Sequence, residues 1–391
     1  MKRIALSTLS LALLGATGVA HAQSSVTLYG LIDDSLQYAH NASPTGTNQL
    51  SMVAGNLQGS RFGLKGTEDL GGGLKAIFQL ENGFDPNSGK LGQGSRMFGR
   101  QAYVGLTGDQ WGTVTLGRQY DPVVDLVQPL TGDNYFGSTF TTPGDVDNND
   151  NSSRTNSAVK YTSPVWGGFQ FEGMYAFGGV AGATGAGQTW SGAATYGTGP
   201  FSIAAGYFHA ANPSPTTGAT RAPTWNGTSD GTIDSIINGG YSTASSVGIA
   251  SVAAQYVAGP FTIAARYSNA QYKQDAFSLF GQTEKYNVAG AYLGYQLTPA
   301  MLLGLGYTYT KASGDTSATY HQVSLGADYN LSKRTDVYLL GVYQHASGEQ
   351  RVPTAAGGTT VQSAVASAAD YGYQSANQSQ EVISLGIRHK F

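Results

Sequence analysis

Hydrophobic and polar residues alternate along most of this chain, in segments of about ten residues. Within residues 61–65, Phe62 and Leu64 would lie on one face of a strand, and Arg61 would lie on the other. The same period of two recurs in 75–81, 169–177, 261–268, 301–310, 323–330 and 381–391. Strands of about ten residues can cross a bilayer when they are tilted. Because helical periodicity is scarce, the pattern predicts an all-β fold.

The lengths of the connections distinguish a membrane barrel from a soluble sandwich, which shows the same alternation. Seven short connections alternate with eight longer, polar ones, which include 210–247 and 346–380. The short connections are 66–73, 107–112, 163–168, 197–200, 257–260, 297–300 and 331–335. Short turns at one end and long loops at the other are typical of outer-membrane barrels. From Val26 to Phe391 the sequence therefore predicts sixteen antiparallel transmembrane strands that close into a β-barrel, with short periplasmic turns and long extracellular loops.

A long, acidic, glycine-punctuated loop runs from Asp121 to Ser153, between strand-like segments that contain arginine. Connections of this length without regular structure are usually functional or disordered, and we interpret this one as functional. Six aspartates lie in the loop and four basic residues lie beside it: Asp121, Asp125, Asp133, Asp145, Asp147 and Asp150, with Arg100, Arg118, Arg154 and Lys160. An acidic loop that faces a basic wall produces a transverse electric field across an opening.

Alternation also assigns charged side chains to the polar face of the predicted strands, which would face the lumen. In the clearest strands six basic residues stand against four acidic ones: Arg61, Lys65, Lys75, Arg266, Arg388 and Lys390 against Asp33, Glu81, Glu172 and Asp328. The orientation of Arg100 and Arg118 stays open, because they share parity with Val104 and Leu116. The residues that we expect to line the lumen are Lys65, Lys75, Glu81, Arg118, Lys160 and Arg266.

The first residues have the pattern of a secretory signal peptide. Lys2 and Arg3 precede an apolar run over residues 4–14, and Ala20 to Ala22 form an A-x-A cleavage pattern. A membrane-anchoring helix needs about 20 predominantly apolar residues, and this run is shorter and contains serine and threonine. We therefore expect a signal peptide over residues 1–22, which is cleaved on export, and a single barrel domain over residues 23–391.

Composition narrows the class of protein further. Of the 391 residues none is cysteine, so an exported chain of this kind is not held together by disulfides. Without Lys2 and Arg3, 19 basic residues remain against 24 acidic ones, which disfavours nucleic acid as a partner. The 24 tyrosines and 15 phenylalanines argue against a disordered chain.

Several blocks of the sequence resemble the sixteen-stranded trimeric general porins of Gram-negative outer membranes, especially the beta-proteobacterial branch. The blocks are SSVTLYGLIDDSLQY (24–38), GSRFGLKGTEDLGGGLKAIFQLE (59–81), FGRQAYVGL (98–106), TLGRQYDP (115–122), SAVKYTSPVWGGFQFEGMYAFG (157–178) and the terminal Phe391. They span the chain from Ser24 to Phe391. The resemblance implies a homotrimer in the outer membrane, surrounded by its lipid.

In that family the third long loop folds into the barrel and narrows it, opposite a cluster of wall arginines. The matching positions here are Arg61, Arg100 and Arg154. We expect these arginines to form the pore constriction with three acids of the loop, Asp121, Asp125 and Asp133. The loop lacks the PEFG-like motif of the enteric porins, so the sequence does not decide which of its acids face the pore. Phe391 matches the family's assembly signal, which the outer-membrane insertion machinery reads.

Asp34 supports the expected trimer independently of the resemblance. By parity it shares the outward face of the first strand with Val26, Leu28, Ile32 and Leu36. A charge that faces lipid near the midplane costs up to a few kcal/mol. This face is therefore expected to pack against another subunit, unless a bulge shifts the phase of the strand.

Three functions are compatible with such a barrel. The first is a water-filled channel for passive diffusion of small hydrophilic solutes and ions, weakly anion-preferring and without a cofactor. The second is a substrate-specific channel with a solute-binding track along the lumen. The third is an adhesin or structural barrel, which would have a plugged lumen. We favour the first. For the wall arginines we prefer the constriction interpretation, because the acid-rich loop lies between Arg118 and Arg154 in the sequence.

Motifs for other chemistry are incomplete. Ser157 and Lys160 have the spacing of an acylating serine motif, but a strand places residues three apart on opposite faces. The six histidines are scattered, without the spacing of a zinc site or a catalytic triad, so we do not expect an enzyme. Asp145, Asp147 and Asn149 resemble the start of a calcium loop, although Asp150 replaces the turn glycine. A solvated acidic rim is the simpler interpretation of these residues.

Overall fold

The computed structural model describes residues 25–215, 220–221, 225 and 235–391. Its first strands are β1 (Ser25–His40), β2 (Gln49–Ala54), β3 (Arg61–Gly71), β4 (Leu74–Gly83), β5 (Gln101–Gly108), β6 (Gly112–Gln119), β7 (Thr155–Thr162), β8 (Phe169–Ala176), β9 (Thr189–Thr198) and β10 (Phe201–Ala211). They are followed by β11 (Ser246–Ala258), β12 (Phe261–Lys273), β13 (Glu284–Thr298), β14 (Met301–Ser313), β15 (Thr319–Asn330), β16 (Thr335–Ser347), β17 (Glu349–Pro353), β18 (Thr359–Ser363) and β19 (Ser379–Lys390).

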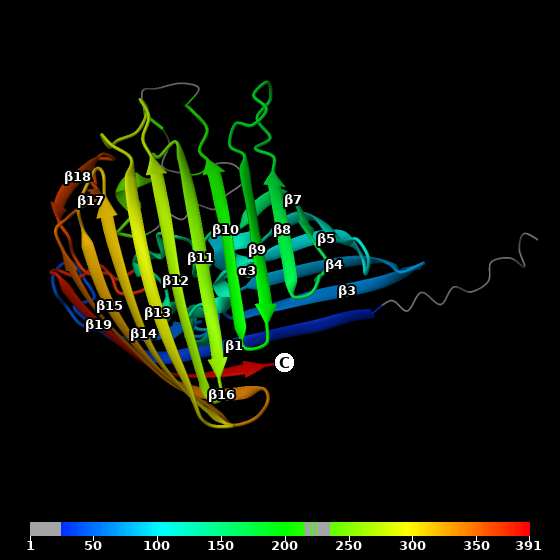
Figure 1. Cartoon of the computed structure of the whole chain (residues 1–391). Helices are drawn as coiled ribbons and strands as arrows, with labels where there is room; N and C mark the ends of the chain where they lie inside the picture. Colours follow the sequence, from blue (N-terminus) through cyan, green and yellow to red (C-terminus); the bar gives the residue numbers. More distant parts are fainter. Residues whose placement is uncertain (1–24, 216–219, 222–224, 226–234) are drawn as a thin grey trace, which may run out of the picture.

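The main sheet closes on itself into a barrel (Figure 1). Each strand pairs antiparallel with its neighbour, and β1 pairs with β19 from Leu31 opposite Lys390 to His40 opposite Glu381. The sheet contains seventeen separate strands, but β2 and β3 pair with successive parts of β1 and together occupy one position. The barrel therefore has sixteen strand positions, as predicted. The hairpin of β17 and β18 belongs to the last long loop.

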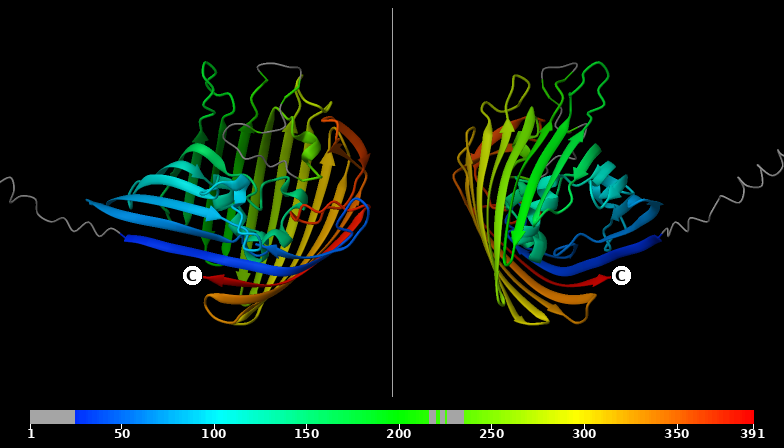
Figure 2. Two further views of the ribbon diagram at one scale, coloured as in Figure 1. Left: turned by 180° about the vertical axis from the view of Figure 1, so that it is seen from behind. Right: turned by 45° about the vertical axis from the view of Figure 1, so that its right-hand side comes forward.

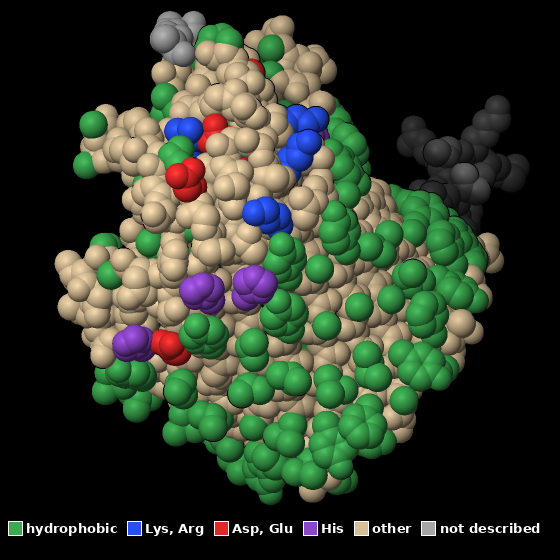
Figure 3. All heavy atoms as spheres, turned by 60° about the vertical axis from the view of Figure 1, so that its left-hand side comes forward, with side chains coloured by type: hydrophobic (Ala, Val, Ile, Leu, Met, Phe, Trp, Pro, Cys, Tyr) green, Lys and Arg blue, Asp and Glu red, His purple; other side chains and the backbone are tan. Residues whose placement is uncertain are grey.

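The two faces of the strands have opposite chemistry. In β15, Val323 and Leu325 are 40% and 57% exposed, whereas Gln322 and Ser324 are buried. The outward side chains form the broad hydrophobic surface that Figure 3 shows over the lower part of the molecule. The inward side chains are largely polar, and many contact segments inside the barrel. The alternation of hydrophobic and polar residues therefore arises as predicted, because the apolar side chains face outward and the polar ones face the interior.

Short turns and long loops lie at opposite ends of the barrel (Figure 1). The turn between β3 and β4 contains Gly71, Gly72 and Gly73, which all have positive φ. Glycine adopts this conformation without the steric cost that a Cβ would bring. All seven predicted short connections join antiparallel neighbours.

The segment 121–153 differs from the unstructured loop expected from the sequence. It contains α3 (Pro122–Leu126), η1 (Gln128–Leu130), α4 (Asp133–Phe136), η2 (Gly137–Phe140) and η3 (Pro143–Asp145). The sequence pattern does not predict these turns, because each is too short to show helical periodicity. Among the residues that the structure describes, the other short helices are α2 (Gly92–Ser95) and η4 (Gly239–Tyr241). In the described part of the chain, no helix has the length and hydropathy needed to cross a membrane.

The predicted signal peptide over residues 1–22 lies outside the described residues. Its cleavage therefore stays a prediction, as does the start of the barrel domain at residue 23.

Candidate pore constriction

The segment between β6 and β7 folds into the interior of the barrel (Figure 2). It enters at Asp121, whose side chain accepts hydrogen bonds from the backbone N–H groups of Val123 (2.8 Å) and Val124 (3.4 Å). Aspartate at the N-cap followed by proline at the first helical position is a strong local signal for a helix start. The first turn of α3 therefore fixes the direction in which the segment leaves the wall.

Two aromatic rings attach the middle of the segment to the barrel wall. Phe136 packs over Gly304 and Gly326 on β14 and β15, and Phe140 packs over Gly306. A Cβ at Gly304 would lie 2.2 Å from a ring carbon of Phe136, and one at Gly326 would lie 2.4 Å from another. Because the inward positions of these strands lack side chains, the rings can lie directly against the sheet.

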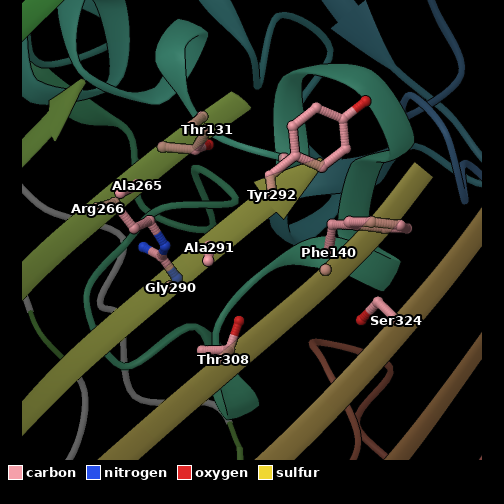
Figure 4. A pocket seen from close by; sticks show the side chains of 12 residues that line it. Thr131, Phe140, Ala265, Arg266, Gly290, Ala291, Tyr292, Thr308 and Ser324 are labelled. Atoms are coloured by element: carbon pink, nitrogen blue, oxygen red, sulfur yellow. The ribbon is translucent and has the colours of Figure 1, made fainter. Parts of the chain in front are cut away.

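Polar contacts attach the rest of the segment. Nη1 of Arg266 lies 2.9 Å from Oδ2 of Asp147, and both side chains are buried. Gln322 donates to the carbonyl of Thr141 (2.9 Å), and Ser324 donates to that of Thr139 (2.6 Å). The seam between segment and wall, shown in Figure 4, encloses a cavity of about 20 Å³, room for roughly one water molecule. The segment is therefore held along its length by aromatic, ionic and hydrogen-bonded contacts.

A larger cavity of about 320 Å³ lies on the other side of the segment. Arg61, Arg100 and Arg154, the three arginines expected at the constriction, line it from the wall. These residues come from three places: the first residue of β3, the residue before β5 and the residue before β7. The guanidinium groups of Arg100 and Arg154 each lie 5.8 Å from the ring centroid of Tyr120. One tyrosine ring thus lies close to two of the three cations.

Glu81 holds Arg100 in place. Its Oε1 lies 2.8 Å from Nε of Arg100, and both side chains are buried. The same carboxylate accepts hydrogen bonds from the hydroxyl groups of Tyr29 (2.9 Å) and Tyr120 (3.1 Å). Glu81, one of the residues expected to line the lumen, therefore acts as the counterion of a wall arginine.

Three acids line the cavity from other segments: Asp133, Asp150 and Asp370. Burial, with repulsion from Asp150, raises the pKa of Asp133 well above its usual value. Burial likewise raises the pKa of Asp150. Asp370, in the long loop before β19, accepts a hydrogen bond from Oγ of Ser152 (3.0 Å). The cavity thus joins cations from the wall with three acids, two of which have a pKa that burial raises.

Of the three acids expected at the constriction, only Asp133 lines this cavity. The carboxylate of Asp121 caps α3 and accepts from Nδ2 of Asn148 (3.2 Å) instead, and burial raises its pKa to about 6. Asp125 pairs with Lys160. Asp121 is thus hydrogen-bonded within the folded segment, and Asp125 is paired with a residue of the neighbouring wall. Neither lines the cavity with the three arginines.

The other predicted lumen-lining residues are dispersed. The ammonium group of Lys65 lies 5.2 Å from the ring centroid of Tyr29, and Lys75 is half-buried. Lys160 and Arg266 contact the folded segment, through Asp125 and Asp147 respectively.

Arg118 lies on a different part of the wall. Its Nε donates to the carbonyl of Gly99 (2.8 Å), and Nη1 donates to Oδ1 of Asn156 (2.5 Å). The pairing of β6 with β7 is irregular between Gly117 and Gln119, which disrupts parity at this position. Arg118 does not belong to the cavity lining.

Several cavity residues have no clear signal in the sequence. Asp150 is one of six loop acids with nothing to set it apart, and Tyr120 is one residue of the TLGRQYDP block. Asp370 lies more than two hundred residues from the segment that it contacts, as the separation of 218 residues between Ser152 and Asp370 shows. No local pattern in the sequence indicates that approach.

The residues considered for calcium are used in protein contacts. Asp145 accepts from the backbone N–H groups of Asp150 (2.9 Å) and Ser152 (3.1 Å). Asp147 pairs with Arg266. In the described ranges, no group of three or more histidine, cysteine or acidic side chains is arranged to hold a metal ion.

Comparison with known proteins gives a consistent result. A family model described as Gram-negative porin matches residues 7–349. An outer membrane porin protein of Bordetella pertussis is 37% identical over 195 residues, which cover 45% of this chain and 48% of that protein. The chain thus spans about half the length of that relative. Outer membrane porin protein 32 of Delftia acidovorans is 29% identical over 404 residues, which cover 98% of this chain and 99% of that protein.

Solved structures also match. An anion-selective porin from Comamonas acidovorans superposes with a TM-score of 0.71 at 25% identity, covering 94% of this chain and 100% of that one. The trimer form of OmpT from Vibrio cholerae gives a TM-score of 0.64 at 16% identity, covering 94% and 99%. The second likeness concerns the fold alone.

Proposed function

The chain belongs to the Gram-negative porin family, and from this premise we propose how its outer-membrane channel selects solutes. The proposed channel is water-filled, admits small hydrophilic solutes and ions by passive diffusion, and weakly prefers anions. The observation that carries the proposal is the cavity in which Arg61, Arg100 and Arg154 stand opposite the inward-folded segment.

The charges at the cavity support an anion preference. Arginine stays protonated throughout the physiological range, so all three guanidinium groups keep their positive charge. Burial raises the pKa of Asp133 and of Asp150, which favours the neutral form of both carboxyl groups. The cations are then only partly balanced. At physiological salt, interactions between exposed charges are largely screened beyond about 8 Å. The charges at the narrowest point of the pore therefore dominate its ion selectivity.

The similar structure from Comamonas acidovorans is that of an anion-selective porin, which agrees with this direction. That selectivity is a property of the Comamonas protein, and it supports the same preference in the channel proposed for this chain. We propose in addition that the channel performs no catalytic turnover, in line with a family of diffusion channels.

Planar bilayers test the diffusion mechanism. Reconstituted protein should give large conductance steps with a linear current–voltage relation, and solute flux should rise without saturation. Saturable flux, or block of the current at low solute concentration, would instead favour the substrate-specific channel. Folded protein that inserts and yet carries no current would contradict both mechanisms.

We also propose that three copies associate through the outer face of β1. Asp34 lies on this face between Ile32 and Leu36, which are 43% and 50% exposed. Its carboxylate accepts hydrogen bonds from Nδ2 of Asn87 (2.9 Å) and from the backbone of Ser35 (3.0 Å). The hydrogen bond from Asn87 reduces the cost of the exposed charge within one chain. A polar contact on an otherwise apolar face nevertheless favours a protein neighbour over lipid.

A further inference from the structure

The pairing of the barrel wall is interrupted on the loop side of β3. β1 pairs with β2 as far as Asp34 opposite Ala54, and with β3 from Leu31 opposite Arg61. Between these pairs, residues 32 and 33 of β1 stand opposite the six residues 55–60. This insertion is a β-bulge of unusual width, since most bulges place two residues opposite one. We call residues 55–60 the wall bulge.

The wall bulge turns into the barrel. Asn56 and Leu57 are 2% and 4% exposed, and Leu57 belongs to one buried cluster with Phe136 and Phe140 of the folded segment. A bulge that turned outward would expose unpaired backbone N–H and C=O groups to lipid, where each costs several kcal/mol. The inward direction brings these groups within reach of polar partners instead.

Asp33 supplies several of these partners. Its Oδ2 accepts hydrogen bonds from the backbone N–H groups of Leu57 (2.9 Å) and Gln58 (2.7 Å). Its backbone carbonyl accepts from the backbone N–H of Gly55 (3.0 Å) and from Oγ of Ser60 (3.0 Å). Residues at the start, middle and end of the wall bulge are thus bound to one residue of β1. The bonds to the carboxylate are charge-assisted, which makes them stronger than bonds between neutral groups.

Tyr338 on β16 fixes the same carboxylate from the other side. Its hydroxyl group donates to Oδ1 of Asp33 (2.5 Å), and both side chains are buried. The two carboxylate oxygens therefore have separate partners, because Oδ1 is bound to the regular wall and Oδ2 is bound to the wall bulge.

The wall bulge borders the cavity that contains the three arginines. Four of its residues line this cavity, namely Gly55, Leu57, Gln58 and Gly59. The carbonyl of Gly59 accepts a hydrogen bond from Nε of Arg61 (2.8 Å). A Cβ added at Gly59 would lie 3.2 Å from Nη1 of Arg100. The wall bulge thus orients one arginine side chain and lies against a second.

The wall bulge also meets the folded segment at Gly137. A Cβ added at Gly137 would lie 2.3 Å from the carbonyl oxygen of Asn56 and 2.4 Å from that of Leu57. Such a close approach requires glycine, which also adopts the φ of 57° at this position without steric cost. Because Gly137 lines the cavity as well, the two inward elements are in contact at its edge.

We propose that the wall bulge is a second inward element of the pore constriction, and that Asp33 is the positioning residue that holds it. The inference rests on the proposed channel function, because it concerns the same cavity. It makes a part of the barrel wall, in addition to the folded segment 121–153, a determinant of pore width. Release of the wall bulge should widen the pore and free the side chain of Arg61.

The first test compares Asp33→Ala with Asp33→Asn in reconstituted full-length protein. Alanine removes both acceptor oxygens, so Asp33→Ala should give a larger and noisier single-channel conductance and shift the size limit for entry of polyethylene glycols to longer polymers. Asparagine removes the same charge, but its Oδ1 can accept from the wall bulge while its amide nitrogen donates to Tyr338. Asp33→Asn should therefore keep the conductance and the size limit of wild type.

Equal conductance and an equal size limit in Asp33→Ala and wild type would overturn the proposal. So would identical changes in Asp33→Ala and Asp33→Asn, since that result would show an effect of the lost charge and not of the hydrogen bonds. Normal current through wild type beside either of these results separates a failure of this inference from a failure of the channel function.

The second test leaves Asp33 in place. The chain contains no cysteine, so a single introduced thiol can be labelled alone. Treatment of Gln58→Cys with the anionic reagent 2-sulfonatoethyl methanethiosulfonate should reduce the current and shift the reversal potential toward cation preference, because the attached sulfonate lies beside the arginines. Thr45→Cys, at an exposed position in the turn after β1, is the matched control and should react without either change. Unchanged current in treated Gln58→Cys would overturn the proposal, even if Asp33→Ala failed to fold.

Discussion

At the scale of single residues, two carboxyl groups govern the charge of the cavity. The carboxyl groups of Asp133 and Asp150 are buried and interact with each other, and burial is the main cause of their raised pKa. A raised pKa means that a carboxyl group is protonated below that value and ionises as the pH rises through it. The groups that face this pair across the cavity are Asp370 and the three arginines Arg61, Arg100 and Arg154. The arginines stay protonated throughout the physiological pH range.

Raising the pH should therefore weaken the anion preference. As the pH rises through the raised pKa of Asp133, ionisation of this carboxyl group adds negative charge beside the arginines, so the ratio of chloride to potassium permeability falls. Asp133→Asn/Asp150→Asn should show a higher ratio that hardly changes with pH. The measurement is the reversal potential under a salt gradient at each pH. A wild type whose ratio of chloride to potassium permeability does not change with pH would exclude Asp133 and Asp150 as determinants of selectivity.

Gly304 is a second residue with a specific consequence. Because a Cβ there would lie 2.2 Å from the ring of Phe136, Gly304→Ala should push this ring off the wall and displace the segment toward the pore. We expect a smaller or noisier single-channel conductance. Gly341→Ala is the matched control, since nothing lies within 4 Å of its added Cβ. Identical conductance of both variants and wild type would show that the ring is not held as described.

At the scale of elements, the attachment of the folded segment depends on the buried ion pair between Arg266 and Asp147. Removal of one partner from a buried pair costs about 3–5 kcal/mol, because the other charge stays buried without compensation. Arg266→Met should therefore loosen residues 139–147 and accelerate their amide hydrogen exchange by on the order of a hundredfold. Arg334→Gln, in an exposed turn, serves as the control. Unchanged exchange in Arg266→Met would mean that the aromatic anchors hold the segment without the ion pair.

The sequence predicts the strands far better than the interior. A wall strand such as β15 is recognisable because Gln322 and Ser324 face inward while Val323 and Leu325 face outward, and that alternation follows from local geometry. The short helices of the segment 121–153 are set by capping and by contacts with distant strands, which leave no period to detect. The resemblance of the sequence blocks locates the three arginines. The acids that lie opposite these arginines are determined by long-range packing. For this reason the sequence led us to expect Asp121 and Asp125 at the cavity, which they do not line, and gave no indication of Asp370, which does.

At the scale of the whole molecule, assembly through the outer face of β1 makes a testable claim. Protein extracted in mild detergent should run as a trimer under non-denaturing conditions. Ile32→Lys, which adds a charge to this face, should shift the population toward monomers by about 1 kcal/mol or more per interface. Val323→Lys adds the same charge to the outward face of β15 and should leave the trimer intact. A wild type that is monomeric by analytical ultracentrifugation would contradict the proposed association.

The central claim is that the wall arginines at the cavity make the channel anion-preferring. The most direct measurement is the reversal potential in a planar bilayer under a tenfold potassium chloride gradient. It compares wild type with Arg61→Gln/Arg154→Gln, which leaves the pair of Arg100 and Glu81 intact. Wild type should give the sign of a chloride-preferring channel, and the double variant should shift toward or beyond the potential of a cation-preferring one. A cation-preferring wild type, or a double variant with the wild-type potential, would contradict the account.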